Sequence, residues 1–166
     1  GNLYAAEIRN NTTLQLLVAS LIIFGGIGFP VLISVYANLK YLIATIIRKL
    51  RGKLRPVKPV KKNVAASIVL IMTLILILTG TLLYYLFESE KSLNGMDNIR
   101  KIIISFFGSV SARTAGFNIT DITLWSYPTI FMMIFLMWIG ASPGSTGGGI
   151  KTTTFALAIR TTWNFI

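Results

Sequence analysis

The sequence IIISFFGSVSARTAGFN, residues 102–118, decides how this chain folds. Its first part, residues 102–112, carries no charge but has only 11 residues. About 20 apolar residues are needed to cross the hydrocarbon core of a bilayer. We therefore expect residues 102–112 to form either a buried helix or a segment that enters a membrane and returns.

Three longer stretches without a charged residue surround this short one, at residues 10–39, 63–87 and 122–150. Each exceeds the length of about 20 residues that a transmembrane helix needs. The whole chain is 54% hydrophobic and only 13% charged, which is typical of a membrane protein. The sequence therefore predicts an all-α membrane protein.

The distribution of charge predicts the orientation in the membrane. The formal net charge is +11, but nine of the sixteen basic residues lie between Lys40 and Lys62, where there is no acidic residue. The positive-inside rule makes residues 40–62 a basic cytoplasmic loop and places residues 88–121, with four acids and four bases, outside. A lipid headgroup or a regulatory partner could also contact the basic loop. Because the charge is concentrated there, we expect no nucleic-acid binding.

The composition also limits the possible chemistry. The chain has no cysteine and no histidine, which excludes disulfides, the usual zinc sites and histidine acid–base catalysis. The first two long stretches have no ionisable group at their centres that could relay protons. We expect a protein that is not an enzyme and has no cofactor of its own. The opening residues contain no secretory signal, so we expect a piece of a longer protein.

The residues that follow the short segment predict an ion selectivity filter. Potassium-channel filters are T-V-G-Y-G loops whose backbone carbonyls replace the water shell of the ion. A glycine at position 116 can adopt the backbone angles that such a loop requires. The predicted filter residues are Thr114, Ala115, Gly116, Phe117 and Asn118, with K⁺ bound by the carbonyls of Thr114, Ala115 and Gly116. The alternative is an ordinary extracellular turn.

Arg113 directly precedes these residues and is unusual in a cation pathway. We expect its guanidinium to lie behind the filter, paired with an acid or with carbonyls. Asp121 is a possible partner.

The run GASPGSTGGGIKT, residues 140–152, first suggests a phosphate-binding loop. That motif, G-x-x-x-x-G-K-[ST], needs the lysine directly after the last glycine. Here Ile150 separates Gly149 from Lys151, so the spacing fails by one residue. The spacing therefore disfavours an ATPase.

Together, FFGSVSARTAGFN, GASPGSTGGGIKTTT and LIIFGGIGFPVL (residues 21–32) resemble the Trk/Ktr/HKT superfamily of potassium transporters, most of all the Ktr-type membrane subunit. Members have four repeats of helix, pore loop and helix in one chain. The resemblance implies that residues 1–39 end the second repeat, with a helix over 13–39, and that 63–166 form the third. The parts of the third repeat would be a transmembrane helix at 63–87, a pore helix at 102–112, the filter at 113–118 and a broken transmembrane helix at 122–166.

The resemblance implies that a glycine-rich loop breaks the last helix below the filter and gates the pore. Pro143 cannot lie inside a regular helix, and each glycine weakens a helix by about 1 kcal/mol. The expected gating residues are Gly140, Ala141, Ser142, Pro143, Gly144, Ser145, Thr146, Gly147, Gly148, Gly149 and Lys151. Alternatively, the third span ends at Gly140 and the loop is cytoplasmic. Lys151 is either a cation barrier or tether, or a charge that reaches out to the membrane interface.

The function implied by the resemblance is K⁺ uptake across a bacterial plasma membrane, with Na⁺ also possible. The implied partners are the remaining repeats of the transporter, a second copy in a homodimer, membrane lipid and a cytosolic ring of RCK domains that binds a nucleotide. The alternatives are a subunit of a homotetrameric two-span cation channel and a membrane protein that binds lipid without transporting.

Overall fold

The computed structural model describes residues 11–50 and 63–165, and this part of the chain is helical, without a strand. Residues 1–10, which are most of the extracellular segment expected at 1–12, and residues 51–62 of the basic loop lie outside the described residues. The elements are α2 (Thr12–Ile27), α3 (Phe29–Leu50), α4 (Val64–Glu88), α5 (Asn98–Thr114), the short 3-10 helix η1 (Ile122–Leu124), α6 (Tyr127–Trp138) and α7 (Thr152–Phe165).

Two of these helices, α3 and α4, are long and apolar enough to cross a membrane, while α2 and α6 are shorter apolar helices. Many large apolar side chains on α2, α3, α4 and α6 are exposed. Asparagine side chains cap two of the helices. Asn11 accepts a hydrogen bond from the N–H of Leu14, and Asn63 accepts one from the N–H of Ala66, so each satisfies a donor of the first turn.

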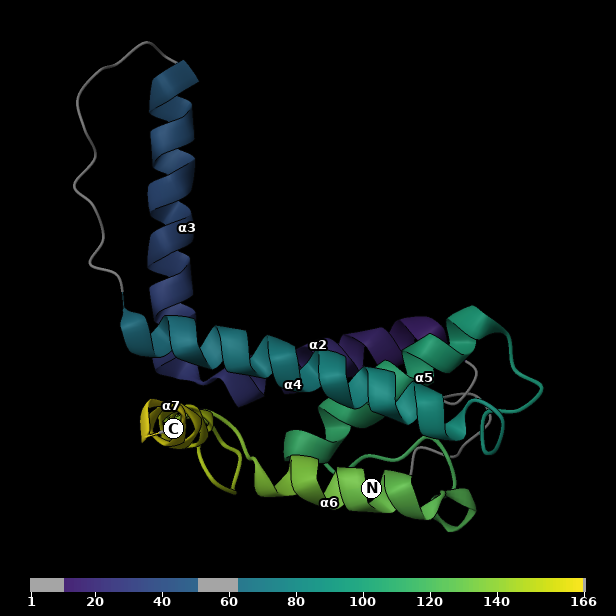
Figure 1. Cartoon of the computed structure of the whole chain (residues 1–166). Helices are drawn as coiled ribbons and strands as arrows, with labels where there is room; N and C mark the ends of the chain where they lie inside the picture. The colour runs from purple at the N-terminus through teal and green to yellow at the C-terminus, as the bar shows by residue number, and fades with distance from the viewer. Residues whose placement is uncertain (1–10, 51–62, 166) are drawn as a thin grey trace.

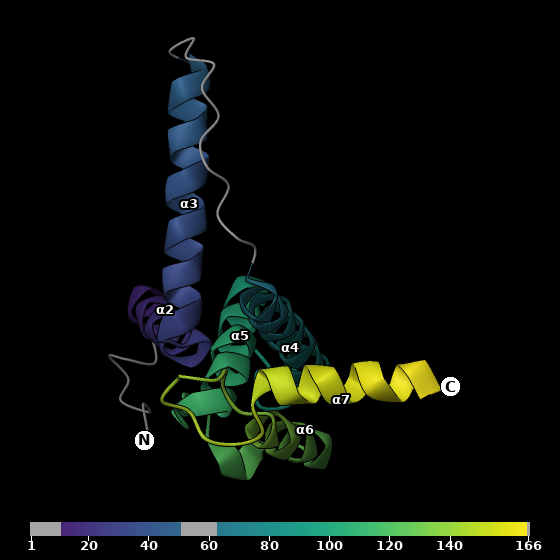
Figure 2. The ribbon, with the colours of Figure 1, turned by 90° about the vertical axis from the view of Figure 1, so that its left-hand side faces the viewer.

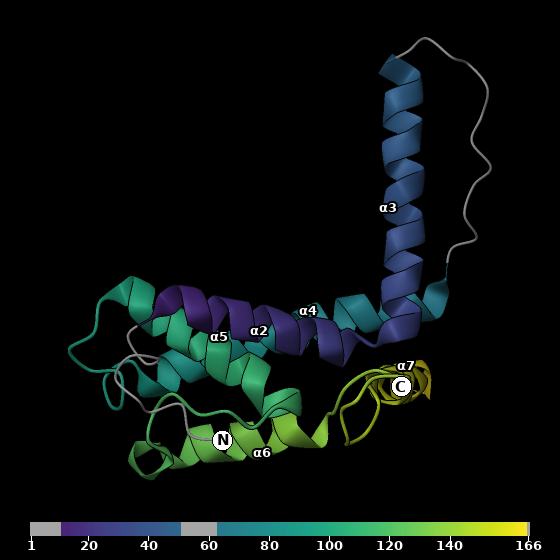
Figure 3. The ribbon, with the colours of Figure 1, turned by 180° about the vertical axis from the view of Figure 1, so that it is seen from behind.

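Helix α5 lies at the centre of the packing, against α2, α4 and α6, whereas α3 rises away from this group (Figure 1 and, from behind, Figure 3). The α4–α5 contact is close, because a Cβ at Gly80 would lie 2.3 Å from the hydroxyl oxygen of Ser109. Small residues permit this close approach of membrane helices. The Ser109 hydroxyl donates to the carbonyl oxygen of Ile77 across the same contact (3.1 Å).

The first long apolar stretch differs from the single helix expected over residues 13–39. It is divided at Gly28, which has a φ of +83°, and α3 then continues to Leu50, through the first part of the expected cytoplasmic loop. Pro30 follows and donates no backbone hydrogen bond, so the chain bends easily here. The helix thus includes Lys40, Arg48 and Lys49, and basic residues are favourable in a last turn.

The last long stretch is divided into α6 and α7, with residues 139–151 between them. Figure 2 shows α7 projecting away from α6 beyond this connection. The expected broken helix over 122–166 is thus present as two pieces, and the first ends at Trp138 while the second begins at Thr152.

Candidate functional site: the loop after α5 and the glycine-rich loop

The segment after α5 begins with a left-handed glycine. Helix α5 is longer than the expected pore helix at both ends and includes Arg113 and Thr114. The backbone N–H groups of Ala115 and Gly116 both donate to the carbonyl oxygen of Ser111, at 3.1 and 2.9 Å. Gly116 has a φ of +66°, a conformation that commonly ends helices and that favours glycine. The expected filter is therefore a helix end at 113–114 followed by an irregular segment.

Ser111, whose carbonyl accepts the bonds at the helix end, also holds this segment through its side chain. The Ser111 hydroxyl accepts from the N–H of Phe117 and donates to the carbonyl oxygen of Phe117, both at 2.6 Å. Ser111 is only 1% exposed, so no bulk water competes for these bonds. The sequence analysis missed Ser111, because it is one of several serines on α5.

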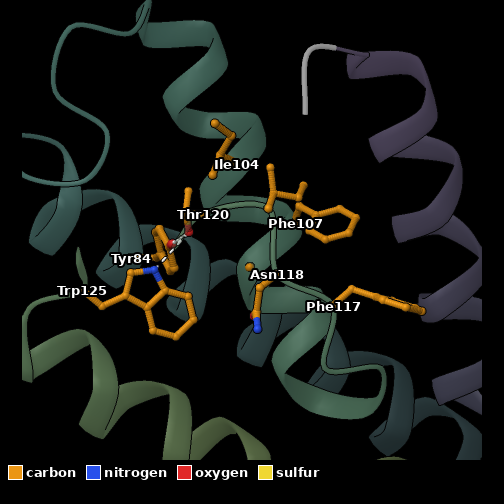
Figure 4. A pocket seen from close by; sticks show the side chains of 9 residues that line it. Tyr84, Ile104, Phe107, Phe117, Asn118, Thr120 and Trp125 are labelled. Carbon is orange, nitrogen blue, oxygen red and sulfur yellow. Dashed lines mark hydrogen bonds between the residues drawn. The ribbon is translucent and has the colours of Figure 1, made fainter. Parts of the chain in front are cut away.

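A cluster of three side chains holds the far end of the same segment (Figure 4). The hydroxyl of Thr120 is hydrogen-bonded to the hydroxyl of Tyr84 (2.8 Å) and accepts a bond from the Trp125 indole N–H (3.0 Å). The two rings meet edge to face, with their centres 5.9 Å apart. Sequence reasoning missed this cluster because its members come from α4, from the segment after α5 and from the residue that follows η1.

Arg113 is not paired with Asp121, which corrects the suggested partnership. Its guanidinium is largely buried, and its Nε has no hydrogen-bond partner within residues 11–50 and 63–165. The Asp121 carboxylate instead accepts from the N–H (3.0 Å) and the hydroxyl (2.8 Å) of Thr123. These bonds lower the pKa of Asp121, because they favour its ionised form.

The glycine-rich loop, residues 140–149, folds back so that its two ends lie together. The N–H of Gly140 donates to the carbonyl oxygen of Ile150, and the N–H of Ile150 donates to that of Trp138, both at 3.0 Å. Inside the loop, the N–H of Ala141 donates to the carbonyl oxygen of Gly148 (3.4 Å). The break between α6 and α7 is therefore an ordered turn of the backbone.

The glycine-rich loop also contacts the end of α5. A Cβ at Gly147 would lie 2.9 Å from the side-chain methyl group of Thr114, so the Thr114 side chain packs closely against the backbone at Gly147. The structure thus brings the first residue of the expected filter together with the expected gating loop.

The same loop is bound to the bend between α2 and α3. Ser142 donates from its N–H to the carbonyl oxygen of Gly26 (3.1 Å) and from its hydroxyl to that of Ile27. A Cβ at Gly144 would lie 3.0 Å from the ring of Pro30. The glycines and the proline of the first long stretch therefore make both a bend and a close contact.

Lys151 bonds the loop that it follows. Its ammonium donates to the carbonyl oxygen of Gly147 at 2.7 Å. Of the roles considered for Lys151, this contact favours a tether that holds the loop.

Comparison with known proteins identifies the family. The family model TrkH, described as a cation transport protein, matches residues 6–166. The chain is 36% identical over 159 residues to the Ktr system potassium uptake protein B of Vibrio alginolyticus, covering 95% of this chain and 31% of that protein. It is 34% identical to the Ktr system potassium uptake protein D of Bacillus subtilis, covering 95% of this chain and 32% of that protein.

The potassium/sodium uptake protein NtpJ of Enterococcus hirae is 29% identical over 158 residues, covering 91% of this chain and 30% of that protein. The chain thus spans about a third of the length of these relatives. All three are named uptake proteins rather than enzymes, in agreement with the sequence analysis. The matched family, the identities and the apolar helices together show that the chain is KtrB-like and belongs to the TrkH family of membrane cation transport proteins.

Proposed function

We propose that the chain is the part of a plasma-membrane potassium uptake protein that contributes one strand, residues 113–118, to a four-stranded selectivity filter. The observation that carries this proposal is the segment after α5. It leaves a buried helix through the left-handed Gly116, and α2, α4 and α6 surround that helix. No atom lies within 4 Å of the position that a Cβ on Gly116 would take, so the backbone faces open space there.

In this proposal the carbonyls of Thr114, Ala115 and Gly116 bind K⁺ in place of its water shell. Selectivity then depends on the position of the backbone, which the bonds to Ser111 and Thr120 hold from two sides. Three further strands come from other repeats of the same transporter. Na⁺ is a possible second ion, because the relative NtpJ is named for both ions.

The glycine-rich loop, with Lys151, is the proposed gate. Its support is the contact between Gly147 and Thr114, which places the loop directly beside the first residue of the filter strand. Further proposed partners are a second copy of the transporter, membrane lipid and a cytosolic RCK ring that binds a nucleotide. The name "Ktr system", carried by two relatives, supports an assembly of several components.

We expect Gly116→Ser in the full-length parent to weaken K⁺ uptake and K⁺/Na⁺ preference when it is expressed in a bacterium that lacks K⁺ uptake. A side chain at this φ costs about 1–2 kcal/mol, so the backbone shifts and the carbonyls lose their positions. The measurement is the KM for K⁺ uptake, with and without Na⁺. We expect this KM to rise about tenfold in the variant.

The matched control is Gly95→Ser. Gly95 has a φ of +79° and equally open surroundings, but it lies in the connection between α4 and α5. Both variants therefore carry a similar backbone strain. Equal uptake by the two variants would refute the filter assignment.

We expect Lys151→Met to raise the maximal rate of K⁺ uptake, because the closed loop loses its bond to the Gly147 carbonyl. A hydrogen bond from a charged donor contributes about 1.5–3 kcal/mol, which allows a gain of about tenfold or more. The control is Arg160→Met, which removes an exposed charge from α7. A Lys151→Met rate equal to that of the control would leave Lys151 as a simple surface charge.

A further inference from the structure

Ser111 of α5 makes several hydrogen bonds with the proposed filter strand, from its carbonyl and from its hydroxyl. Its carbonyl oxygen accepts from Ala115 and Gly116, and its hydroxyl bonds both the N–H and the carbonyl oxygen of Phe117. A single buried residue therefore holds three successive residues of the strand.

The bond to the carbonyl of Phe117 has a chemical consequence. A hydroxyl that donates to this oxygen turns the carbonyl toward α5 and occupies one of its lone pairs. The side chain of Phe117 is fixed as well, because it packs against the cluster that includes Ala19 and Val110. In Figure 4 the ring points toward α2, away from Tyr84 and Trp125. The carbonyl group and the ring of Phe117 are thus each held in one orientation.

We propose that Ser111 is a positioning residue that determines ion selectivity by keeping the Phe117 carbonyl out of the ion pathway. This inference rests on the proposed function of residues 113–118 as a filter strand. Selectivity between K⁺ and Na⁺ depends on the number of carbonyl dipoles around the ion and on their freedom to move. Without the Ser111 hydroxyl, the Phe117 carbonyl is free to turn toward the ion and the strand loses its fixed geometry.

Two other serines of α5 provide matched controls. The Ser109 hydroxyl donates to Ile77 on α4 (3.1 Å), and the Ser105 hydroxyl donates to Lys101 within α5 (2.7 Å). Both serines are fully buried. Changing either to alanine removes a buried hydrogen bond without changing a contact to the filter strand.

The experiment compares Ser111→Ala with Ser109→Ala and Ser105→Ala in the full-length parent, reconstituted in lipid vesicles. The measured quantity is the ratio of K⁺ to Na⁺ flux, which does not depend on how much protein each variant yields. We expect Ser111→Ala to lower this ratio about tenfold, the equivalent of about 1.4 kcal/mol for the two lost side-chain bonds, while both controls keep the wild-type ratio. Ser111→Thr, which retains a hydroxyl, should restore part of the ratio.

A Ser111→Ala ratio equal to that of Ser109→Ala would overturn the inference, because Ser111 would then only stabilise the helix end. The Gly116→Ser result separates this failure from a failure of the proposed function. If Gly116→Ser changes selectivity and Ser111→Ala does not, the filter assignment stands and the role of Ser111 fails. If neither changes it, the filter assignment fails.

Discussion

Gly140→Ala is expected to abolish K⁺ uptake by the full-length parent. A Cβ at residue 140 would lie 1.6 Å from the carbonyl oxygen of Gly148 and 2.6 Å from its carbonyl carbon. Both are backbone atoms, so no side-chain rotation relieves the clash. The two ends of the glycine-rich loop would have to separate, with the loss of the bonds Gly140–Ile150 and Ala141–Gly148.

The control for Gly140→Ala lies in the same loop. Gly148 has no atom within 4 Å of its Cβ position, and its φ is not positive. Alanine at this position lowers the conformational entropy of the unfolded chain, so it stabilises the folded protein by about 0.4–1 kcal/mol at most. We therefore expect Gly148→Ala to reach the membrane in wild-type amounts and to transport K⁺.

The assay for this pair is the initial rate of K⁺ uptake, divided by the amount of protein in the membrane. Wild-type activity of Gly140→Ala would mean that the working transporter does not hold the loop in this conformation. Loss of activity in both variants would mean that transport depends on the flexibility of the loop rather than on its packing.

The sequence predicted those parts of the fold that depend on local properties. Residues 63–87 have no charge, and α4 covers nearly the same range. Pro143 cannot lie inside a regular helix and the glycines around it weaken one, and the structure ends α6 before them and starts α7 after them. Charge and backbone freedom belong to each residue, so they can be recognised without knowledge of distant contacts.

Gly25, Gly26, Gly28 and Pro30 suggest a kink or a close helix contact in the first stretch, and the structure has both, but these residues do not show what holds the bend. A stretch without charge indicates where a chain avoids water, but not where its axis turns. The bend is stabilised by the bonds from Ser142 to the carbonyl oxygens of Gly26 and Ile27. The approach is close, because a Cβ at Gly28 would lie 2.7 Å from the Ser142 hydroxyl. More than a hundred residues separate these partners in the sequence.

The supports of the candidate site were missed for the same reason. Tyr84 and Trp125 lie within or beside long apolar stretches, where an aromatic residue carries no special signal. Their importance comes from the shared bond to Thr120, which is 36 residues from Tyr84. The residues of the proposed filter form a local sequence pattern, whereas the groups that hold them come from distant parts of the chain.

Glu88 is a buried acid, and we expect its replacement to cause a large loss of the protein's folding stability. It is fully buried at the end of α4, and its Oε1 accepts from the N–H (2.8 Å) and the hydroxyl (2.8 Å) of Ser126 and from the hydroxyl of Thr129 (2.6 Å). Ser126 directly precedes α6, so the carboxylate lies at the positive N-terminal end of that helix. It joins α4 to the start of α6.

Glu88→Ala should therefore lower the free energy of unfolding by about 3 kcal/mol or more, because a bond to a charged group contributes about 1.5–3 kcal/mol and three buried donors lose their acceptor. Thermal unfolding of the purified full-length protein in detergent measures this loss. Glu90→Ala, which removes an exposed acid from the same connection, is the control and should unfold as the wild type does.

The same change should also affect the proposed ion site, because Trp125 lies next to Ser126 and donates to Thr120. When α6 loses its link to α4, this bond loses its fixed geometry and the outer end of the filter strand becomes free to move. We therefore expect Glu88→Ala to raise the KM for K⁺, and Thr129→Val, which removes one donor only, to raise it less. A stable Glu88→Ala protein with the wild-type KM would show that α6 is held to α4 by apolar packing alone.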